Sequence, residues 1–200
     1  MNSSPKASRP TREETQDRIL TKADELFRQY GFGKTTVADI AQELDMSPAN
    51  IYKFFVSKDA LVQASAERSL SLVRKKVLSV VQSRRSALRR LEGMVLVIFR
   101  FHQDLFHNER HIFKMVLQAH QEAWKSIDSY NAFLFQTTGA LLEEGIASGE
   151  IRKGNSAALT PPLLDALHVA LHPYLRPSWS PDEKEHRVRA HIRFVLASLG

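Results

Sequence analysis

The chain has 200 residues, of which 43% are apolar and 25% are charged, and it contains no cysteine. This length suits one globular domain or a small domain fused to a larger one, and the missing cysteine excludes disulfides, thiolate metal clusters and a thiol nucleophile. The longest apolar run, Met94–Phe99, is far shorter than the roughly 20 residues of a membrane span. We therefore expect a soluble cytoplasmic protein with no membrane partner.

The net charge of +6 indicates a polyanionic partner such as nucleic acid, but the charge is unevenly distributed. Residues 1–60 hold nine Lys and Arg against nine Asp and Glu, whereas residues 61–100 hold nine against two. If the first part of the chain binds DNA, it does so through the placement of individual charges, because its total charge is zero.

The N-terminal part of the chain predicts a flexible arm followed by a long helix. Residues 1–10 contain Ser, Pro, Lys and Arg but no core residue, which is typical of a mobile basic arm. Thr11 and Glu14 have the spacing of a capping box, and Gly31 is suited to end the helix that the box begins. The apolar stripe of this helix consists of Ile19, Ala23, Leu26, Phe27 and Tyr30.

Two short helices follow. Thr36, with Asp39 three residues later, predicts a helix that runs to about Leu44. Ser47 as N-cap and Pro48 at the first helical position predict the next one.

Longer helical patterns fill the middle of the chain. Helices are expected at about 85–105, 109–124 and 127–148, because apolar residues recur there at spacings of three and four. Before them, Ser57 can cap a fourth helix. The apolar residues of that helix are Leu61, Val62, Leu72, Val73, Val77, Val80 and Val81.

Prolines set the expected limits of the last two helices. Because Pro161 and Pro162 lack backbone N–H groups, the next helix is expected to begin near residue 160 and to end before Pro173. Ser180 is an N-cap candidate for the last helix. Together these patterns predict an all-α protein of about nine helices.

The segment Val37–Phe55 has the residue order of a helix-turn-helix. The two helices of this motif meet almost at a right angle, so small and apolar residues are needed at fixed positions. Ala41 is small enough for the crossing of the helices, and Asp45 tolerates the left-handed backbone of the turn. The core positions hold Ile40, Leu44, Met46, Ile51 and Phe54. Two ordinary packed helices are the alternative, but they would not require this order.

The same region resembles the TetR family of bacterial transcription regulators. The resemblance lies in ILTKADELFRQYGF and TTVADIAQELDMSPANIYKFFVSKDAL, within about residues 12–62. It implies a three-helix helix-turn-helix DNA-binding domain, expected over 11–58, and a larger helical effector-binding and dimerisation domain over 59–200. The matching residues are Ile19, Ala23, Leu26, Phe27, Gly31, Thr35, Thr36, Ile40, Ala41, Leu44, Ser47, Ile51, Tyr52, Phe55, Lys58 and Leu61.

The resemblance also implies a function. It indicates a dimeric repressor that a small-molecule effector releases from a palindromic operator. A homodimer is physically required as well, since one short recognition helix binds DNA weakly. The chain departs from the common residues of the family at Asp45, Ala49 and Lys53, so the bases that it reads can differ.

Geometry indicates which side chains of the recognition helix, residues 48–55, would contact bases. Ile51 and Phe54 face inward, which leaves the other side chains for the major groove. Asn50 offers a donor and an acceptor and can bind adenine through two hydrogen bonds, while Ala49 or the preceding proline could contact a thymine methyl group.

Phosphate contacts are expected around the same helix. Tyr52 and Lys53 suit phosphate oxygens, and the resemblance implies the same for Thr36 and Lys58 at helix starts, where backbone N–H groups favour phosphate. Thr36 would also cap its helix without DNA, and the lysines could be ordinary solvated charges. The predicted DNA contacts are Thr35, Thr36, Ser47, Pro48, Ala49, Asn50, Tyr52, Lys53 and Lys58, with Arg9 and Arg12 as additions.

The family dimerises through its last two helices, which correspond to about residues 162–172 and 182–199. Each stretch has an apolar stripe, which either forms the dimer interface or faces the core of its own chain. The predicted interface residues are Leu163, Leu167, Leu171, Val188, Ile192, Val195 and Leu199.

The family also encloses a small-molecule cavity in its C-terminal domain. Aromatic side chains at helical spacing would wall such a cavity around an apolar or aromatic ligand, although they are more often core residues. An effector that binds only the form unable to bind DNA must weaken operator binding. The predicted effector contacts are Phe99, Phe113, Trp124, Tyr130, Phe133 and His168.

The spacing of four histidines suggests an alternative to an organic effector, namely a metal ion. His107 and His111, and separately His168 and His172, have the i,i+4 spacing that places two imidazoles on one helix face. A metal-responsive regulator is therefore an alternative function, although solvated histidines are the favoured explanation. A helical interaction protein without an effector is another alternative function.

Since no phosphate loop, GxSxG or HExxH motif is present, we expect no enzyme, catalytic residue, metal or cofactor.

A basic cluster lies just after the predicted DNA-binding region. It is either the solvated side of two helices or a source of long-range attraction to DNA, with a salt-dependent contribution. Its residues are Arg74, Lys75, Lys76, Arg84, Arg85, Arg89 and Arg90.

Overall fold

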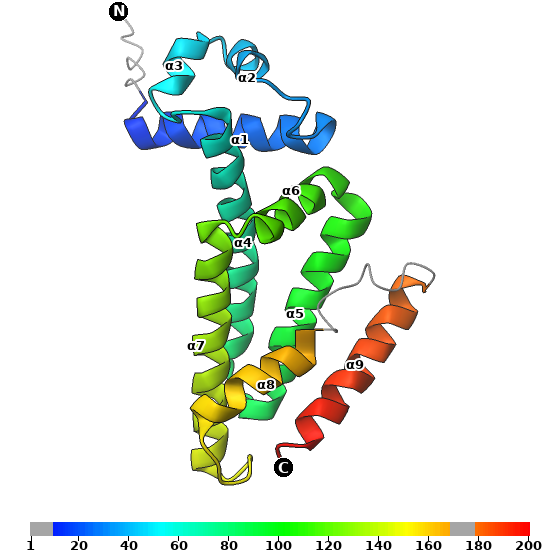
Figure 1. The fold of residues 1–200 in the computed structure, drawn as a ribbon. Helices are drawn as coiled ribbons and strands as arrows, with labels where there is room; N and C mark the ends of the chain where they lie inside the picture. Colours follow the sequence, from blue (N-terminus) through cyan, green and yellow to red (C-terminus); the bar gives the residue numbers. More distant parts are fainter. Residues whose placement is uncertain (1–9, 169–178) are drawn as a thin grey trace, which may run out of the picture. The chain divides into compact units, whose positions relative to one another are not determined.

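A computed structural model describes residues 10–168 and 179–200, and within these ranges the chain forms nine α-helices and no strand (Figure 1). The expected all-α fold is confirmed. Among the predicted positions, Arg9, Leu171 and His172 lie outside the described residues. The helices are α1 Arg12–Tyr30, α2 Val37–Glu43, α3 Pro48–Tyr52, α4 Lys58–Val81, α5 Ala87–Asn108, α6 Arg110–Gln121, α7 Lys125–Ser148, α8 Ser156–His168 and α9 Pro181–Ala197.

The chain divides into two compact units, residues 1–65 and 66–200, and α4 contributes to both. Each described helix is either too short or too polar to cross a membrane.

The helices of the first unit begin at the predicted caps, and the first of them also ends at the predicted glycine. Thr11 Oγ1 accepts a hydrogen bond from the Glu14 N–H (3.1 Å), and the Glu14 carboxylate accepts one from the Thr11 N–H (2.7 Å). Gly31 ends α1 with a φ of 86°, and Ser57 Oγ accepts from the backbone N–H of Ala60 (3.0 Å) at the start of α4. The core of this unit consists of Ile19, Ala23, Leu26, Phe27, Val37, Ile40, Ala41, Ile51, Phe55, Leu61 and Val62.

In the second unit, α4 and α7 lie side by side, and α5 packs against α7 and α9 (Figure 1). Leu72, which was expected in the apolar stripe of α4, is 46% exposed because it is out of step with the spacing that buries its neighbours. Residues central to this core are Leu70, Val73, Val77, Leu91, Met94, Ile98, Tyr130, Leu142, Leu163 and Ile192.

Helix α8 begins at Ser156, one turn earlier than the prolines suggested. Asn155 supplies the missing signal: its Oδ1 accepts hydrogen bonds from the N–H groups of Ala157 (2.9 Å) and Ala158 (3.3 Å). Pro161 and Pro162 therefore lie in the second turn, where each removes one helical hydrogen bond. The predicted start near residue 160 was wrong because an Asn cap outweighed this cost.

The stripes predicted to form a dimer interface face the core of their own chain. This is a correction for Leu163, Leu167, Ile192 and Leu199, because side chains buried within one chain cannot contact a second copy, whereas Val188 and Val195 are only half-buried. An apolar stripe shows that a helix face is covered, but it does not show which chain covers it. Leu163, Leu167, Ile192 and Leu199 are 5%, 1%, 0% and 4% exposed, and Val188 and Val195 pack half-buried against the same core.

The basic cluster is not one surface. Arg90 is buried, donates to the carbonyl oxygen of Val81 (3.1 Å) and forms an ion pair with Glu144. Arg74 is half-buried and pairs with Glu67 (3.1 Å). Attraction of DNA can therefore be assigned only to the exposed members, which are Lys75, Lys76, Arg84, Arg85 and, paired with Glu92, Arg89.

Candidate nucleic-acid interface

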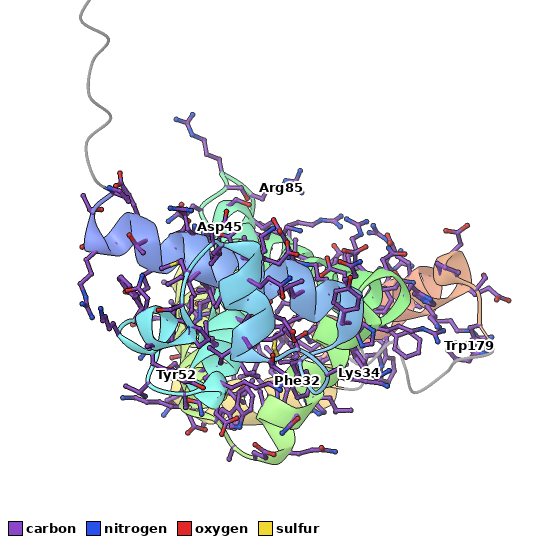
Figure 2. The ribbon with its side chains drawn as sticks, turned by 90° about the horizontal axis from the view of Figure 1, so that it is seen from above. Phe32, Lys34, Asp45, Tyr52, Arg85 and Trp179 are labelled. Atoms are coloured by element: carbon purple, nitrogen blue, oxygen red, sulfur yellow. The ribbon has the colours of Figure 1, made fainter. Side chains whose placement is uncertain are left out.

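Helices α2 and α3 form the predicted helix-turn-helix. The turn between them passes through Asp45, which has a φ of 54° and is labelled in Figure 2. The backbone N–H of Met46 donates to the carbonyl oxygen of Ala41 (2.9 Å), which closes the turn. Ala41 is 1% exposed and Ile40 and Ile51 are fully buried, so the small residue lies in the core of the motif, as expected.

The start of α3 is fixed by local hydrogen bonds. Ser47 Oγ accepts from the backbone N–H of Asn50 (3.2 Å), and Pro48 occupies the first helical position. The helix ends at Tyr52 with Lys53 as its C-cap, so the recognition helix is shorter than the predicted 48–55. It has little more than one turn, and the fully buried Ile51 anchors it to the core.

The other side of α3 is open to solvent. Pro48, Ala49 and Lys53 are exposed, and Tyr52, labelled in Figure 2, is 46% exposed. Asn50 is half-buried. The structure therefore brings five of the predicted contacts onto one short edge, which we call the α3 edge.

Arg12 adds a cation beside this edge. Its guanidinium lies over the ring of Phe54, with 5.2 Å from Cζ to the ring centroid, and its Nη2 donates to the carbonyl oxygen of Lys53 (3.1 Å). A cation at a helix C-terminus is electrostatically favourable. Phe54 is half-buried beneath Arg12, so the predicted inward position of this ring is only partly realised.

A second group of predicted contacts surrounds the start of α2. Thr36 Oγ1 accepts from the Asp39 N–H (3.1 Å), and the Asp39 carboxylate accepts from the Thr36 N–H (2.7 Å). Lys58 Nζ donates to the carbonyl oxygen of Gly33 (3.4 Å), just before this helix. The hydrogen bonds from Thr36 lower the pKa of Asp39, and the Lys58 charge acts in the same direction. Thr36 and Lys58 are thus brought together.

The structure corrects the prediction that Thr35 contacts DNA. It is 2% exposed, and its hydroxyl donates to the carbonyl oxygen of Gly31 (3.0 Å). This side chain ties the loop to the end of α1, so it does not reach the surface as a DNA contact.

The acidic residues of this unit are largely held by their own neighbours. Glu25 (2.6 Å) and Glu43 (3.8 Å) both pair with Lys22, so two acidic side chains of this unit share one lysine. Lys34 is exposed two residues before the α2 cap, as Figure 2 shows, and sequence reasoning missed it. A lysine directly before a capping threonine pair is the signal that could have identified it.

Comparison with known proteins confirms the family. Residues 19–65 match the bacterial regulatory proteins of the tetR family, and residues 87–191 match the tetracyclin repressor-like C-terminal domain. The chain belongs to the TetR family. It is therefore a DNA-binding transcriptional regulator and not an enzyme.

Several curated relatives are similar at the sequence level. The HTH-type transcriptional regulator YdeS of Bacillus subtilis (strain 168) is 30% identical over 152 residues, which are 74% of this chain and 73% of YdeS. The HTH-type transcriptional regulator UidR of Escherichia coli (strain K12) is 36% identical over 67 residues, which are 32% of this chain and 34% of UidR. The match to UidR thus spans about a third of that protein.

Solved structures show the same fold. A transcriptional regulator from Cytophaga hutchinsonii ATCC 33406 has a TM-score of 0.76 at 18% identity and covers 92% of this chain and 98% of its own. The TetR-family regulator PfmR of Thermus thermophilus has a TM-score of 0.60 at 24% identity, over 90% of this chain and 98% of its own. At these identities the likeness concerns the fold alone.

The second unit of this TetR-family chain contains the predicted effector contacts. Phe99 is 1% exposed and belongs to the core. The half-buried Phe113 packs edge-to-face on Phe106, with 5.2 Å between centroids, and the indole N–H of Trp124 donates to Glu122 (2.8 Å). Each of these three residues thus has a packing or hydrogen-bonding role within the described structure.

Tyr130 and Phe133 do lie together, on α7. The guanidinium carbon of Arg74 lies 6.0 Å from each ring centroid. Burial raises the pKa of the Tyr130 hydroxyl well above its ordinary value, although the Arg74 charge opposes this. The Tyr130 hydroxyl therefore keeps its proton at neutral pH and can donate a hydrogen bond.

His168, the last predicted effector contact, is exposed at the end of α8. Burial lowers the pKa of His120, and the nearby His168 contributes in the same direction. Within residues 10–168 and 179–200, no three His, Asp or Glu side chains are grouped to hold a metal ion. The metal-responsive alternative therefore gains no support from the described part of the chain.

Proposed function

We propose that this TetR-family regulator is a homodimeric repressor that a small-molecule effector releases from a palindromic operator. The observation that carries the proposal is the α3 edge, a short capped helix whose exposed side presents polar and cationic side chains. Residues 11–58 would bind DNA, and residues 59–200 would bind the effector and the second copy. Because its target is chromosomal, such a regulator would work in the bacterial cytoplasm.

Each residue of the α3 edge has a definite part in the proposal. Asn50 would read adenine, and Ala49 with Pro48 would contact thymine methyl groups. Tyr52 and Lys53 would bind phosphate oxygens, which fix the register of the protein on the duplex.

The helix starts would hold the flanking phosphates. Thr36, Lys58 and the newly identified Lys34 surround the N-terminus of α2, where backbone N–H groups and the helix dipole favour an anion. Ser47 holds the cap of α3 in place. Arg12 would contribute a further positive charge beside Lys53.

The dimer face that we now favour is the exposed side of α8 and α9. Phe194 is 79% exposed on α9, and the exposed Ala190 and Ala197 lie about one helical turn before and after it, where small side chains would allow a second helix to approach closely. An exposed aromatic residue within a small apolar patch is a typical interface anchor. The residues of this face are Ala158, Pro162 and Ala166 on α8 and Ala190, Phe194 and Ala197 on α9.

Operator selection tests the DNA-binding part of the proposal. Purified full-length protein is mixed with sheared genomic DNA, and bound fragments are sequenced. We expect enrichment of a palindrome whose half-sites are about one helical turn apart or somewhat more. A duplex with one half-site scrambled is the matched control and should bind at least tenfold more weakly. Equal binding of all duplexes would contradict sequence-specific operator recognition.

Sedimentation tests the dimer. Wild-type protein should sediment as a dimer at micromolar concentration, and Phe194→Glu should give a folded monomer. Leu72→Glu, at an exposed leucine of α4, is the control and should remain dimeric. A dimer that withstands Phe194→Glu would place the interface elsewhere.

A further inference from the structure

Arg74 has one half of its guanidinium paired and the other half buried without a partner. Its Nη1 donates to Glu67 Oε1 (3.1 Å). Its Nε and Nη2 are inaccessible to solvent and form no hydrogen bond. Buried donors without acceptors are energetically costly, so such a pair calls for an explanation.

Arg100 of the same unit shows what this edge of a guanidinium binds. Its Nε donates to Glu185 Oε2 (3.1 Å) and its Nη2 donates to Glu185 Oε1 (2.6 Å). The two parallel N–H groups match the two oxygens of a carboxylate. Arg74 presents the same Nε–Nη2 edge, but its acceptor is missing.

Two hydroxyl groups on α7 are also buried without a hydrogen-bond partner. Tyr130 is 3% exposed, and its Oη forms no hydrogen bond. Ser126 lies one helical turn earlier, and its Oγ is also buried without a partner. Arg74 lies over the rings of Tyr130 and Phe133, so the guanidinium that carries the unpaired Nε and Nη2 lies beside an aromatic wall on α7, the helix that also carries Ser126.

We propose that Arg74, Tyr130 and Ser126 bind the carboxylate of a monoanionic organic acid, and that this acid is the effector. The proposal rests on the proposed function for its regulatory meaning, but its binding chemistry stands on these residues. Glu67 already occupies one side of Arg74, which favours a single negative charge over a dianion. The aromatic wall and the apolar residues Leu70 and Val73 on α4 favour an apolar body.

The first test observes the guanidinium directly. In ¹H–¹⁵N spectra of the full chain, Arg74 Nε–H is assigned with Arg74→Lys, and sodium acetate or sodium phenylacetate is titrated at constant ionic strength. We expect a saturable downfield shift of Arg74 Nε–H, while Arg100 Nε–H, already bound to Glu185, stays unchanged. Acetamide and phenylacetamide should leave both signals unshifted. No saturable shift with either acid, or the same shift with the amides, would overturn the proposal.

The second test uses variants and calorimetry with phenylacetate. Arg74→Gln should weaken binding at least tenfold, because two charge-assisted hydrogen bonds are lost, and Tyr130→Phe, which removes only a hydroxyl, should weaken it about threefold to tenfold. Arg100→Gln is the matched control, since its carboxylate is internal, and should bind as the wild type does. Equal affinity of wild type and Arg74→Gln would overturn the proposal.

Operator binding separates this proposal from the proposed function. Arg74→Gln should bind the selected operator as tightly as the wild type without ligand, but its complex should not be released by phenylacetate. If the wild type binds the acid and no operator is found, the proposed function fails while the carboxylate site stands. If the operator is bound and Arg74 does not respond to acids, the site fails alone.

Discussion

The two units of the molecule differ in how their functional residues relate to the core. In the first unit, local caps and a tight turn hold α3 so that its buried side is one residue, Ile51, and its remaining side chains face outward. In the second unit, the apolar stripes of α8 and α9 are covered by α5 and α7, and the exposed faces carry small residues and Phe194. For a short capped helix, the sequence predicts which side chains face solvent. For a long amphipathic helix, it predicts only which side chains are covered.

This difference has a physical origin. The hydrogen bonds of caps and turns are formed by residues within four positions of each other. Their geometry can therefore be predicted from a short segment of sequence. Coverage of a stripe depends on residues far along the chain, so the same pattern serves a core and an interface.

The largest loss of stability is expected when a predicted interface residue that lies in the core is truncated. Ile192→Ala should lower the free energy of unfolding by about 2–4 kcal/mol, because a fully buried side chain is truncated and leaves a cavity. Arg193→Ala, at the exposed neighbouring position, should change it by less than about 0.5 kcal/mol. Urea denaturation at fixed protein concentration measures both. Equal losses would mean that Ile192 is not covered within its own chain.

A change on the α3 edge should affect DNA and leave stability intact. Tyr52→Ala combined with Lys53→Ala should weaken operator binding about 100-fold, or about 2.7 kcal/mol, because two phosphate contacts are lost. The slope of log affinity against log salt should also fall by about one. Fluorescence anisotropy at several salt concentrations measures both quantities. Lys75→Ala, an exposed lysine of the second unit, is the control, and an equal loss there would indicate general charge attraction.

A smaller effect is expected at the ion pair that joins α5 to α9. Hydrogen bonds from Arg100 and Arg189 lower the pKa of Glu185 to about 2. Since the pKa is lower in the folded state, the stabilisation is present above about pH 4.5 and is lost as pH falls toward 2. Glu185→Gln should therefore lower the free energy of unfolding by about 1 kcal/mol at pH 7, discounted for partial exposure, and by less near pH 3. Thermal unfolding across this range would contradict the assignment if the difference grew with acid.

The smallest change in stability is expected at the turn between α2 and α3. Asp45 has a φ of 54°, which costs an L-residue energy that glycine does not incur. Asp45→Gly should raise the free energy of unfolding by about 0.5 kcal/mol. Asp17→Gly, in the regular helix α1, is the matched control and should lower it by about 0.3 kcal/mol, the difference in helix propensity between the two residues. A loss at Asp45 would show that the aspartate stabilises the turn through its side chain.

Contacts between distant segments were invisible in the sequence. The first turn of α5 is capped by Glu150, whose carboxylate accepts from the N–H groups of Ala87 (2.8 Å) and Leu88 (3.3 Å). Ser86 occupies the N-cap position but forms no side-chain cap. A local reading would have assigned the cap to Ser86, because the partner that replaces it lies more than 60 residues away.

The order of the helices, the turn at Asp45 and the outer residues of α3 followed from the sequence, because each depends on neighbours in the chain. The family followed from the same segment. Tertiary structure decided that Thr35 is buried, that most of the stripe residues of α8 and α9 are internal, and that Arg74 lies over the rings of Tyr130 and Phe133. These outcomes depend on which side chains from distant helices meet, and packing in three dimensions fixes that.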